Sequence, residues 1–298
     1  MIKLVLPGGS GFLGRTLTAH LAQRGWEIVI LSRRPVVVEG ARVVAWDQAR
    51  AEFEGATGVF NLAGRSVNCR YGPANREEIL RSRVESTQQV GQAVAACQTP
   101  PRLWINASTA TIYRHAEDRP MDEATGELGS GFSVNVAQAW ERAFENCAAP
   151  RTRKVALRLG IALDRTRGGT LDYFRALARA GFAGPLGPGT QYVSWLHGED
   201  FARAVEWLAG RQDLRGVFNC TTPYPTRNQG FMRVLRETCG APWGVPSGRW
   251  MLEMGAWALR TETELILKSR RVIPTRMQRE GFVFHFPEWR TAARHLLC

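Results

Sequence analysis

The sequence predicts an α/β fold in which a doubly wound parallel sheet is followed by a smaller, mostly helical C-terminal lobe. In the first half, short β-branched runs alternate with helical patterns, which is typical of successive βαβ units. After about Asp164 the composition shifts, and glycine and proline gather in the loop Gly181–Gly189. The 298 residues are 44% hydrophobic and 22% charged, which excludes a disordered or disulfide-stapled scaffold.

Short apolar runs predict the strands of the first half. They are Ile2–Leu6, Glu27–Leu31, Arg42–Ala45, Gly58–Ala63, Leu103–Ala107 and Val155–Leu159. Apolar residues that recur with helical spacing predict the helices between them. These are a helix through Leu13, Leu17 and Leu21, a long helix over Arg76–Cys97, and a helix over Val134–Cys147.

The second half contains fewer predicted strands. We expect short strands at Gln191–Leu196 and Gly216–Cys220, with a helix at Glu199–Ala209 between them. The last 70 or so residues are mostly helical in pattern, and a strand at Phe282–Phe286 is expected before a closing helix.

A glycine-rich turn follows the first predicted strand, with the sequence Gly8-Gly9-Ser10-Gly11-Phe12-Leu13-Gly14. Gly8 allows a tight turn, Gly11 lets the backbone approach a diphosphate, and Gly14 permits close packing of helix on strand. The next helix presents unpaired N–H groups and the positive end of its dipole to such an anion. In this context the spacing predicts dinucleotide binding and a Rossmann-type sheet.

The end of the second strand predicts which dinucleotide is bound. An NAD site places Asp or Glu there to hold the ribose 2′-hydroxyl. Here the strand ends in Leu31-Ser32-Arg33-Arg34, and the first carboxylate after it is Glu39. Guanidinium groups suit a 2′-phosphate through charge and paired hydrogen bonds. The sequence therefore predicts NADP(H) as cofactor, with Arg33 and Arg34 at its 2′-phosphate.

These features predict two interleaved lobes. Residues 1–163 are expected to form the NADP-binding domain, to which the segment 198–222 returns. Residues 164–298 are expected to form the lobe that caps the nucleotide and supplies the substrate pocket.

Composition narrows the other function classes. The six cysteines are scattered without a C-x-x-C pair, so we expect reduced, structural thiols and no metal site. No apolar stretch approaches a membrane span, and the apolar N-terminal run is too short for a secretory signal, so a cytoplasmic protein is expected.

The net charge of +12 raises the question of a nucleic-acid partner. The main basic cluster is Lys268, Arg270, Arg271, Arg276 and Arg279. It lacks the interleaved aromatic residues that stack on bases, and charge runs on helices are usually solvated. We therefore do not expect nucleic-acid binding. Lysine occurs only at Lys3, Lys154 and Lys268, so a catalytic lysine has few possible positions.

Further motifs resemble the short-chain dehydrogenase/reductase superfamily, in its extended, epimerase/dehydratase-like branch. The motifs are Asn61-Leu62-Ala63-Gly64, Ser108-Thr109-Ala110-Thr111-Ile112-Tyr113 and Trp195-Leu196-His197-Gly198-Glu199-Asp200. More narrowly, the chain resembles an atypical group called epimerase family proteins, which carry a C-terminal domain of unassigned function. Matching pieces that cover the chain in order include Trp140-Glu141, Arg158-Leu159-Gly160, Val272-Ile273-Pro274 and Glu280-Gly281-Phe282.

The resemblance implies a set of cofactor contacts. They are the turn Gly8–Leu13, Ser32 and Arg33, the motif Asn61–Gly64 with Leu62 and Ala63, Glu78 and Arg83 on the long helix, and Ile161 after the sixth strand. Arg83 suits a cation that faces the diphosphate or the nicotinamide ribose, whereas Glu78 is as easily explained as a solvated helix charge. Extended members often dimerise through two helices, which makes Arg76–Cys97 a candidate interface.

This chain departs from the superfamily at the catalytic pair. Conventional members use Tyr-x-x-x-Lys, in which the lysine lowers the tyrosine pKa and the tyrosine acts as acid or base. Here Ser133 and Ala137 occupy those positions, or Phe132 and Val136 in the neighbouring register. The chain also has Arg65 where the atypical group usually has an acidic residue.

Three hydroxyl groups remain as candidates near the nicotinamide: Ser108, Thr109 and Tyr113. With Arg83 they can polarise a carbonyl for hydride transfer. A packed aromatic after a strand is the alternative for Tyr113. For His197 and Asp200 we favour structural roles, with His197 holding the loop at Gly184–Gly189 and Asp200 capping the next helix.

Two functions are therefore expected. The first is an NADP(H)-dependent oxidoreductase or epimerase that acts on a small carbonyl or hydroxyl substrate. The second is a non-catalytic, NADPH-binding regulatory protein that lost the Tyr/Lys pair, since some relatives are associated with cell-division control. NADPH oxidation in a screen of carbonyl compounds distinguishes the two.

Overall fold

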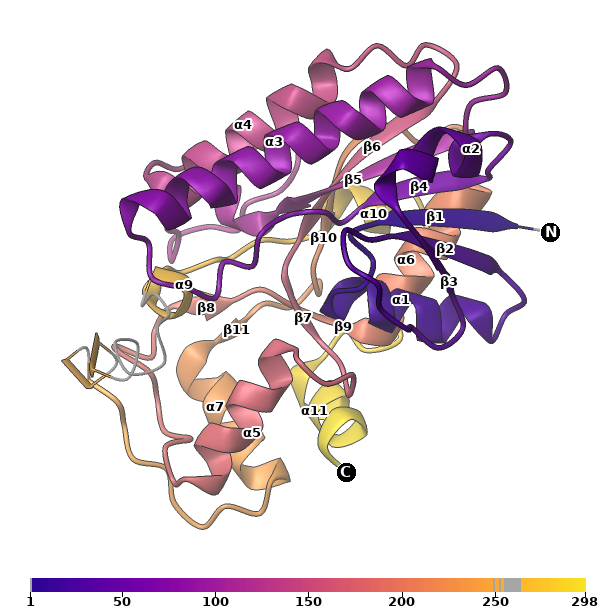
Figure 1. Ribbon diagram of the computed structural model, residues 1–298. Helices are drawn as coiled ribbons and strands as arrows, with labels where there is room; N and C mark the ends of the chain where they lie inside the picture. Colours follow the sequence, from indigo (N-terminus) through magenta and orange to yellow (C-terminus); the bar gives the residue numbers. More distant parts are fainter. Residues whose placement is uncertain (1, 249, 252, 255–263) are drawn as a thin grey trace.

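The computed structural model describes residues 2–248, 250, 251, 253, 254 and 264–298, and a seven-stranded sheet lies at its centre (Figure 1). Its strands are β1 (Lys3–Pro7), β2 (Glu27–Leu31), β3 (Arg42–Val44), β4 (Gly58–Asn61), β5 (Leu103–Thr109), β6 (Arg153–Leu159) and β10 (Gly216–Cys220). They are all parallel, in the order β10-β6-β5-β4-β1-β2-β3. This is the predicted Rossmann-type, doubly wound sheet.

Helices cover both faces of the sheet. On one face α3 (Pro73–Ala95) and α4 (Phe132–Asn146) lie side by side, with the short 3-10 turn Trp46–Gln48 and α2 (Ala49–Phe53) near them (Figure 1). On the other face α1 (Phe12–Ala22) packs against α6 (Gly198–Gly210). Side chains alternate along β1 accordingly, with Leu6 in the core under α1 and Val5 in the core under α3. Burial on both faces explains the uninterrupted apolar runs of these strands.

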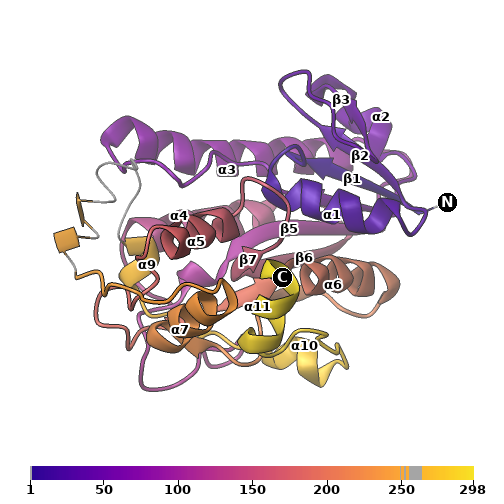
Figure 2. The ribbon, with the colours of Figure 1, turned by 90° about the horizontal axis from the view of Figure 1, so that it is seen from below.

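The rest of the chain forms the C-terminal lobe at one edge of the sheet (Figure 2). Its two-stranded pairs are β7 (Ile161–Leu163) with β9 (Trp195–His197), and β8 (Tyr192–Val193) with β11 (Thr226–Arg227). Its helices are α5 (Thr170–Arg179), α7 (Asn228–Thr238), α9 (Glu264–Leu267) and α11 (Trp289–Leu297), whereas α10 (Thr275–Arg279) packs on β10 of the central sheet. In its core Phe231 and Trp289 stack with their ring centroids 4.1 Å apart.

Most predicted elements are confirmed, with shifted ends. The long helix begins at Pro73 and not at Arg76, because proline is favoured in the first turn of a helix, where its missing N–H is not needed. The strand predicted at Gln191–Leu196 is split into β8 and β9. Between them Ser194 Oγ donates to the carbonyl of Arg270 over 2.6 Å and accepts from the N–H of Val272.

The strand predicted at Phe282–Phe286 is wrong: this segment is irregular. The backbone N–H groups of His285 and Phe286 each donate to the carboxylate of Asp200 over 2.8 Å, and not to a neighbouring strand. The role predicted for Asp200 is wrong as well. It is 1% exposed in the first turn of α6, and the residue that caps this helix is His197.

His197 joins α6 to the C-terminal helix. Its Nδ1 accepts from the N–H of Glu199, and its Nε2 lies 3.0 Å from Nδ1 of His295 on α11. The ring stacks on Phe286 at 3.8 Å, so His197 does not hold the loop at Gly184–Gly189 as predicted. Burial, with the charge of His295, lowers the pKa of His197 to about 4.

None of the helices in the described ranges combines the length and the apolar character needed to cross a bilayer.

The buried His197 makes the stability depend on pH. Its pKa is depressed in the folded protein, so between about pH 6.5 and 4 the unfolded chain binds more protons than the folded one. The free energy of unfolding should therefore fall as the pH falls through this window, by about 3 kcal/mol from His197 alone. Urea unfolding at a series of pH values measures this.

A His197→Asn variant is the control, because an asparagine oxygen can still accept from the N–H of Glu199 but does not titrate. The groups that face His197 are His295, Asp164, Glu199 and Arg165, and all of them remain in the variant. Its unfolding free energy should depend less on pH than that of the wild type. Parallel pH curves for the two proteins would show that His197 is not the source.

Candidate functional site

The carboxyl ends of the central strands bring the predicted residues to one edge of the sheet. From β1 the chain passes outward to β2 and β3 on one side, and from β4 to β5 and β6 on the other. Such a reversal of strand order opens a crevice between β1 and β4, where ligands bind in open α/β sheets. The glycine turn, Ser32–Arg34, Asn61–Gly64 and Ser108–Thr109 all follow or end these strands.

Sterics require glycine at three positions of the turn, Gly8, Gly9 and Gly14. A Cβ on Gly9 would lie 2.6 Å from Cβ of Leu6. Gly8 has φ of 75°, and a Cβ there would lie 2.6 Å from Cα of Ala63. A Cβ on Gly14 would lie 2.1 Å from the carbonyl oxygen of Gly9. The close approach of β1, α1 and the end of β4 therefore excludes any side chain at Gly8 or Gly14.

Gly11 differs, because nothing in the fold fills the space beside it. A Cβ there would meet only the carbonyl oxygen of Gly8, at 3.7 Å. Gly11 is exposed and precedes α1, and no side chain caps the N-terminus of that helix. The first N–H groups of α1 are thus left facing the crevice beside the half-buried Ser10, Phe12 and Leu13.

The turn after β2 presents two cations. The Ser32 hydroxyl donates to the carbonyl of Arg34 over 2.8 Å and accepts from its N–H, which fixes the local backbone. The side chains of Arg33 and Arg34 are exposed. Glu78 on α3 lies within reach of this charge: its hydrogen bond to Arg81 lowers its pKa, and the charges of Arg65 and Arg33 contribute further.

The backbone of the Asn61–Gly64 motif packs against the glycine turn. Asn61 is fully buried, its Nδ2 donates to Oδ1 of Asn106 over 2.9 Å, and its Oδ1 accepts from the N–H of Ala63. The N–H of Leu62 donates to the carbonyl of Pro7. Asn61 therefore fixes the backbone of Leu62 and Ala63 directly under Gly8.

Arg83 braces the loop that follows this motif. Its Nη1 donates to the carbonyls of Arg65 and Ile79, each over 3.0 Å, and its guanidinium lies 5.1 Å from the centre of the Trp140 ring. Burial lowers the pKa of Arg83 to about 10. A Cβ on Gly64 would lie 3.2 Å from Cγ of Arg83, so the two are in close contact.

The C-terminal lobe reaches the same crevice. Ile161 begins β7, and its N–H donates to the carbonyl of Ser194. The ring of Phe12 packs so closely on Gly169 that a Cβ there would lie 2.3 Å from it. Arg15 on α1 donates to the carbonyl of Arg167 over 2.9 Å.

Two of the three candidate catalytic hydroxyls lie in a buried network of side chains. The Ser108 hydroxyl donates to Oε1 of Glu141, and Glu141 pairs with Arg158 through two hydrogen bonds of 2.8 and 2.7 Å. Nη1 of Arg158 donates to the Tyr113 hydroxyl over 2.8 Å, and that hydroxyl donates to Oδ1 of Asn219 over 3.0 Å. Burial raises the pKa of Tyr113, which is 1% exposed.

Thr109 is placed differently. It is the last residue of β5 and half-exposed at the edge of the sheet, and its Oγ1 accepts from the N–H of Thr111 over 3.1 Å. Among the three candidates it is the hydroxyl that lies outside the buried network.

Sequence reasoning had not assigned Glu141, Arg158 and Asn219 to the site. Glu141 and Arg158 were noted only as pieces of family motifs. One signal could have identified the pair: each of these two charged residues lies within an otherwise apolar segment, and ions are rarely buried without a partner.

Ser133, which with Phe132 is a candidate for the position of the missing tyrosine, lies at the start of α4. Its hydroxyl donates to Oε2 of Glu264 on α9 over 3.1 Å, and Ala137 is fully buried. The part of the chain that the structure describes holds no cluster of His, Cys, Asp and Glu suited to a metal ion. All six cysteines are free.

The network predicts a large effect for one isosteric substitution. Glu141→Gln removes the negative charge that faces the buried Arg158, and breaking such a pair typically costs about 3–5 kcal/mol of unfolding free energy. Glu145→Gln, at an exposed position on the same helix, is the control and should change it by no more than about 0.5 kcal/mol. Equal, small losses in urea unfolding would contradict this account of the network.

Comparisons with known proteins agree with this geometry. Residues 4–150 match the NAD dependent epimerase/dehydratase family, and residues 249–296 match a domain of unknown function, DUF1731. The chain is 28% identical over 302 residues to the epimerase family protein SDR39U1 of Bos taurus, and the match covers 100% of both chains. It is 27% identical over 303 residues to the epimerase family protein YfhF of Bacillus subtilis (strain 168), covering 100% of this chain and 98% of that one.

A solved structure shares the whole fold. The crystal structure of human epimerase family protein SDR39U1 (isoform 2) with NADPH matches with a TM-score of 0.89 and 27% identity, and the match covers 99% of each chain. The resemblance inferred from the motifs is thereby confirmed. The chain belongs to the NAD dependent epimerase/dehydratase family and carries a C-terminal DUF1731 domain.

Proposed function

We propose that this protein binds NADP(H) in the crevice between β1 and β4 and uses it to oxidise, reduce or epimerise a small carbonyl or hydroxyl substrate. One observation carries the proposal. The uncapped N-terminus of α1 and the exposed Arg33 and Arg34 lie at the same edge of the sheet, where they match the diphosphate and the 2′-phosphate of one nucleotide.

The residues present fit this cofactor along its length. Gly8, Gly9, Ser10, Gly11, Phe12, Leu13 and Gly14 would hold the diphosphate, Ser32, Arg33 and Arg34 the 2′-phosphate, Leu62, Ala63 and Glu78 the adenosine, and Arg83 and Ile161 the nicotinamide half. The open space beside Gly11 supports the first contact. The NADPH named with the human relative supports the choice of nucleotide. Bound NADP(H) supplies or accepts a hydride.

The three hydroxyl side chains at and after the end of β5 have different proposed roles. We assign the half-exposed Thr109 to hydrogen-bond the reacting oxygen of the substrate. Ser108 and Tyr113 act as positioning residues, since their hydroxyls hold β5, α4 and β6 together through Glu141 and Arg158.

A non-catalytic NADPH-binding role is the second candidate. The observation that favours it is the loss of the Tyr/Lys pair, whose positions hold Ser133 and Ala137 or, in the neighbouring register, Phe132 and Val136. NADPH oxidation with any member of a panel of small aldehydes and ketones would exclude this role. Tight NADPH binding without turnover on the whole panel would favour it.

The assignment of Arg33 to the 2′-phosphate predicts a selective loss of affinity. A charge-assisted hydrogen bond contributes about 1.5–3 kcal/mol, so Arg33→Ala should weaken NADPH binding roughly 10- to 100-fold. The affinity for NADH should stay unchanged, because NADH lacks the phosphate. Fluorescence titration measures both nucleotides. Arg215→Ala removes the same charge just before β10, at the opposite edge, and should leave both affinities unchanged.

A different substitution tests the diphosphate site. Gly11→Ala adds a methyl group where the fold leaves open space, so the free energy of unfolding should change by less than about 1 kcal/mol. The same methyl group would occupy the space beside the N-terminus of α1 in which we place the diphosphate, so NADPH affinity should fall at least tenfold. Calorimetric titration and urea unfolding of one preparation measure both. Unchanged NADPH affinity would contradict the placement of the diphosphate.

A further inference from the structure

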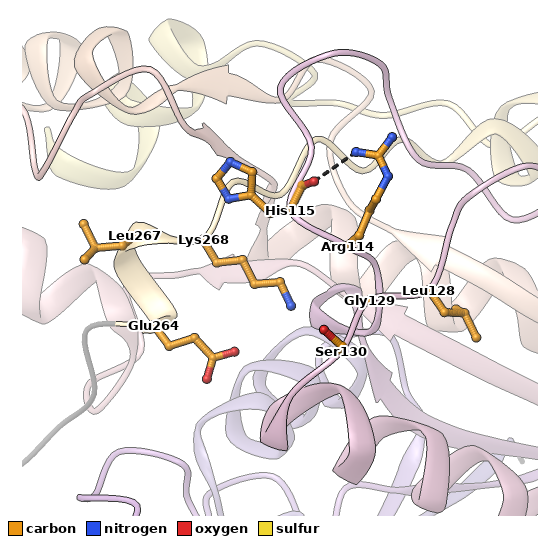
Figure 3. A pocket seen from close by; sticks show the side chains of 8 residues that line it. All are labelled: Arg114, His115, Leu128, Gly129, Ser130, Glu264, Leu267 and Lys268. Atoms are coloured by element: carbon orange, nitrogen blue, oxygen red, sulfur yellow. Dashed lines mark hydrogen bonds between the residues drawn. The ribbon is translucent and has the colours of Figure 1, made fainter.

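A cavity of about 640 Å³ lies beyond the end of β5, between the two lobes. One wall comes from the segment after β5, with Arg114, His115 and Ser130. The other comes from Glu264 at the start of α9 and from Lys268 just after that helix (Figure 3). Figure 3 shows the Lys268 ammonium between the Glu264 carboxylate and the Ser130 hydroxyl. None of the residues assigned above to NADP(H) or to the substrate oxygen lines this cavity.

Of the three lysines in the chain, only Lys268 lies at the catalytic edge of the sheet. Lys3 begins β1 at the opposite edge and pairs with Glu52 over 2.9 Å. Lys154, near the start of β6, donates to the carbonyls of Glu145 and Cys147, each over 3.0 Å. Lys3 and Lys154 are thus held away from the crevice by structural contacts.

The other basic side chains that line the cavity already have hydrogen-bond partners. Arg114 binds the carboxylates of Asp118 and Glu127, with distances of 2.8 and 3.0 Å. Nδ1 of His115 accepts from the N–H of Ser269 over 3.1 Å. The ammonium group of Lys268 is bound more weakly, because its Nζ lies 3.4 Å from the carbonyl oxygen of Thr111, which is long for a hydrogen bond.

The same contact links Lys268 to the proposed substrate-binding hydroxyl. The N–H of Thr111 donates to Oγ1 of Thr109, so the ammonium and Thr109 are attached to the same turn at the end of β5. Arg270 also reaches this turn, because its Nε donates to Oγ1 of Thr111 over 3.1 Å. Burial, with the charge of Arg270, lowers the pKa of Lys268, which favours proton transfer near neutral pH.

Glu264 connects α9 to the site of the missing tyrosine. Its carboxylate accepts from the hydroxyl of Ser133, one of the two candidates for the tyrosine position. Lys268 directly follows α9, and its N–H donates to the carbonyl of Glu264 over 3.2 Å, which holds the two residues one turn apart. The C-terminal lobe thus brings an acid–base pair to the place where the Tyr/Lys pair of other family members is absent.

We propose that this cavity is the substrate site and that Nζ of Lys268 is the proton donor to the reacting oxygen of the substrate. The inference rests on the proposed function. In reduction, the carbonyl carbon receives the hydride that the bound nucleotide supplies, and the electron pair of the C=O π bond moves to oxygen. An N–H bond of Lys268 breaks, an O–H bond forms, and the neutral amine takes a proton from water. Oxidation reverses these steps.

The scarcity of lysine allows a direct test without a known substrate. Reductive methylation with ¹³C-formaldehyde labels only Lys3, Lys154, Lys268 and the N-terminus, and a Lys268→Arg variant assigns the Lys268 signal. In ¹H–¹³C spectra we expect Lys268 to titrate at a lower pH than dimethyl-lysine free in solution, because burial lowers its pKa. Added NADPH should shift the Lys268 signal and leave Lys3 and Lys154 in place, because their ammonium groups lie at the opposite edge.

NADPH binding is measured in parallel by fluorescence, which separates the two proposals. If NADPH binds but the Lys268 signal does not move, or if Lys268 titrates like dimethyl-lysine free in solution, the inference is overturned while the proposed function stands. If no binding is seen by fluorescence, the proposed function itself fails.

Kinetics add a second test for any carbonyl compound that the wild type reduces. Arginine keeps the positive charge but does not release a proton at neutral pH, so Lys268→Arg should lower kcat about 100-fold or more and leave NADPH affinity unchanged. Lys3→Arg is the matched control and should keep full activity. A kcat of Lys268→Arg within threefold of the wild type would overturn the assignment.

Discussion

The site depends on one steric constraint, the contact between the glycine turn and the end of β4. With no side chain at Gly8 the turn rests on the backbone of Ala63, and with none at Gly14 helix α1 lies against Gly9. This contact aims the N-terminus of α1 into the crevice where the strand order reverses. Asn61 secures it from beneath through its bonds to Ala63 and Asn106.

Segments from both halves of the chain meet beside this crevice. Phe12 and Arg15 of α1 contact the segment at Arg167–Gly169, and Glu264 of α9 contacts Ser133 of α4. The Glu141–Arg158 pair fixes the end of β5, because it binds the hydroxyls of Ser108 and Tyr113, which lie on either side of Thr109 in the sequence. The buried ion pair thus holds the end of β5 in place. In the two proposals, the contacts with the substrate come from Thr109 and Lys268, which lie outside the buried network.

Local sequence patterns were sufficient to predict the features that depend on local physics. Strand β2 and the turn Gly8–Gly14 could be predicted because their apolar run and their glycine spacing lie within one short segment. Arg33 and Arg34 could be placed for the same reason, directly after a strand. The fold class followed from the alternation of such segments.

The features that were mispredicted or missed depend on partners far away in the sequence. Phe282–Phe286 has an alternating pattern, but Asp200, more than 80 residues earlier, takes its backbone N–H groups. The lysine count reduced the candidates to Lys268, Lys3 and Lys154, yet only the packing of α9 beside the turn at Thr111 distinguishes Lys268 from the other two. No local pattern predicts such contacts.

A crystal structure of the protein grown with NADPH tests the central claim most directly. We predict the 2′-phosphate at Arg33, the diphosphate over Gly11 at the start of α1, and the nicotinamide beside Thr109 with its reactive face toward the cavity at Lys268. A nucleotide bound elsewhere, or a nicotinamide ring turned away from Thr109 and that cavity, would contradict the account.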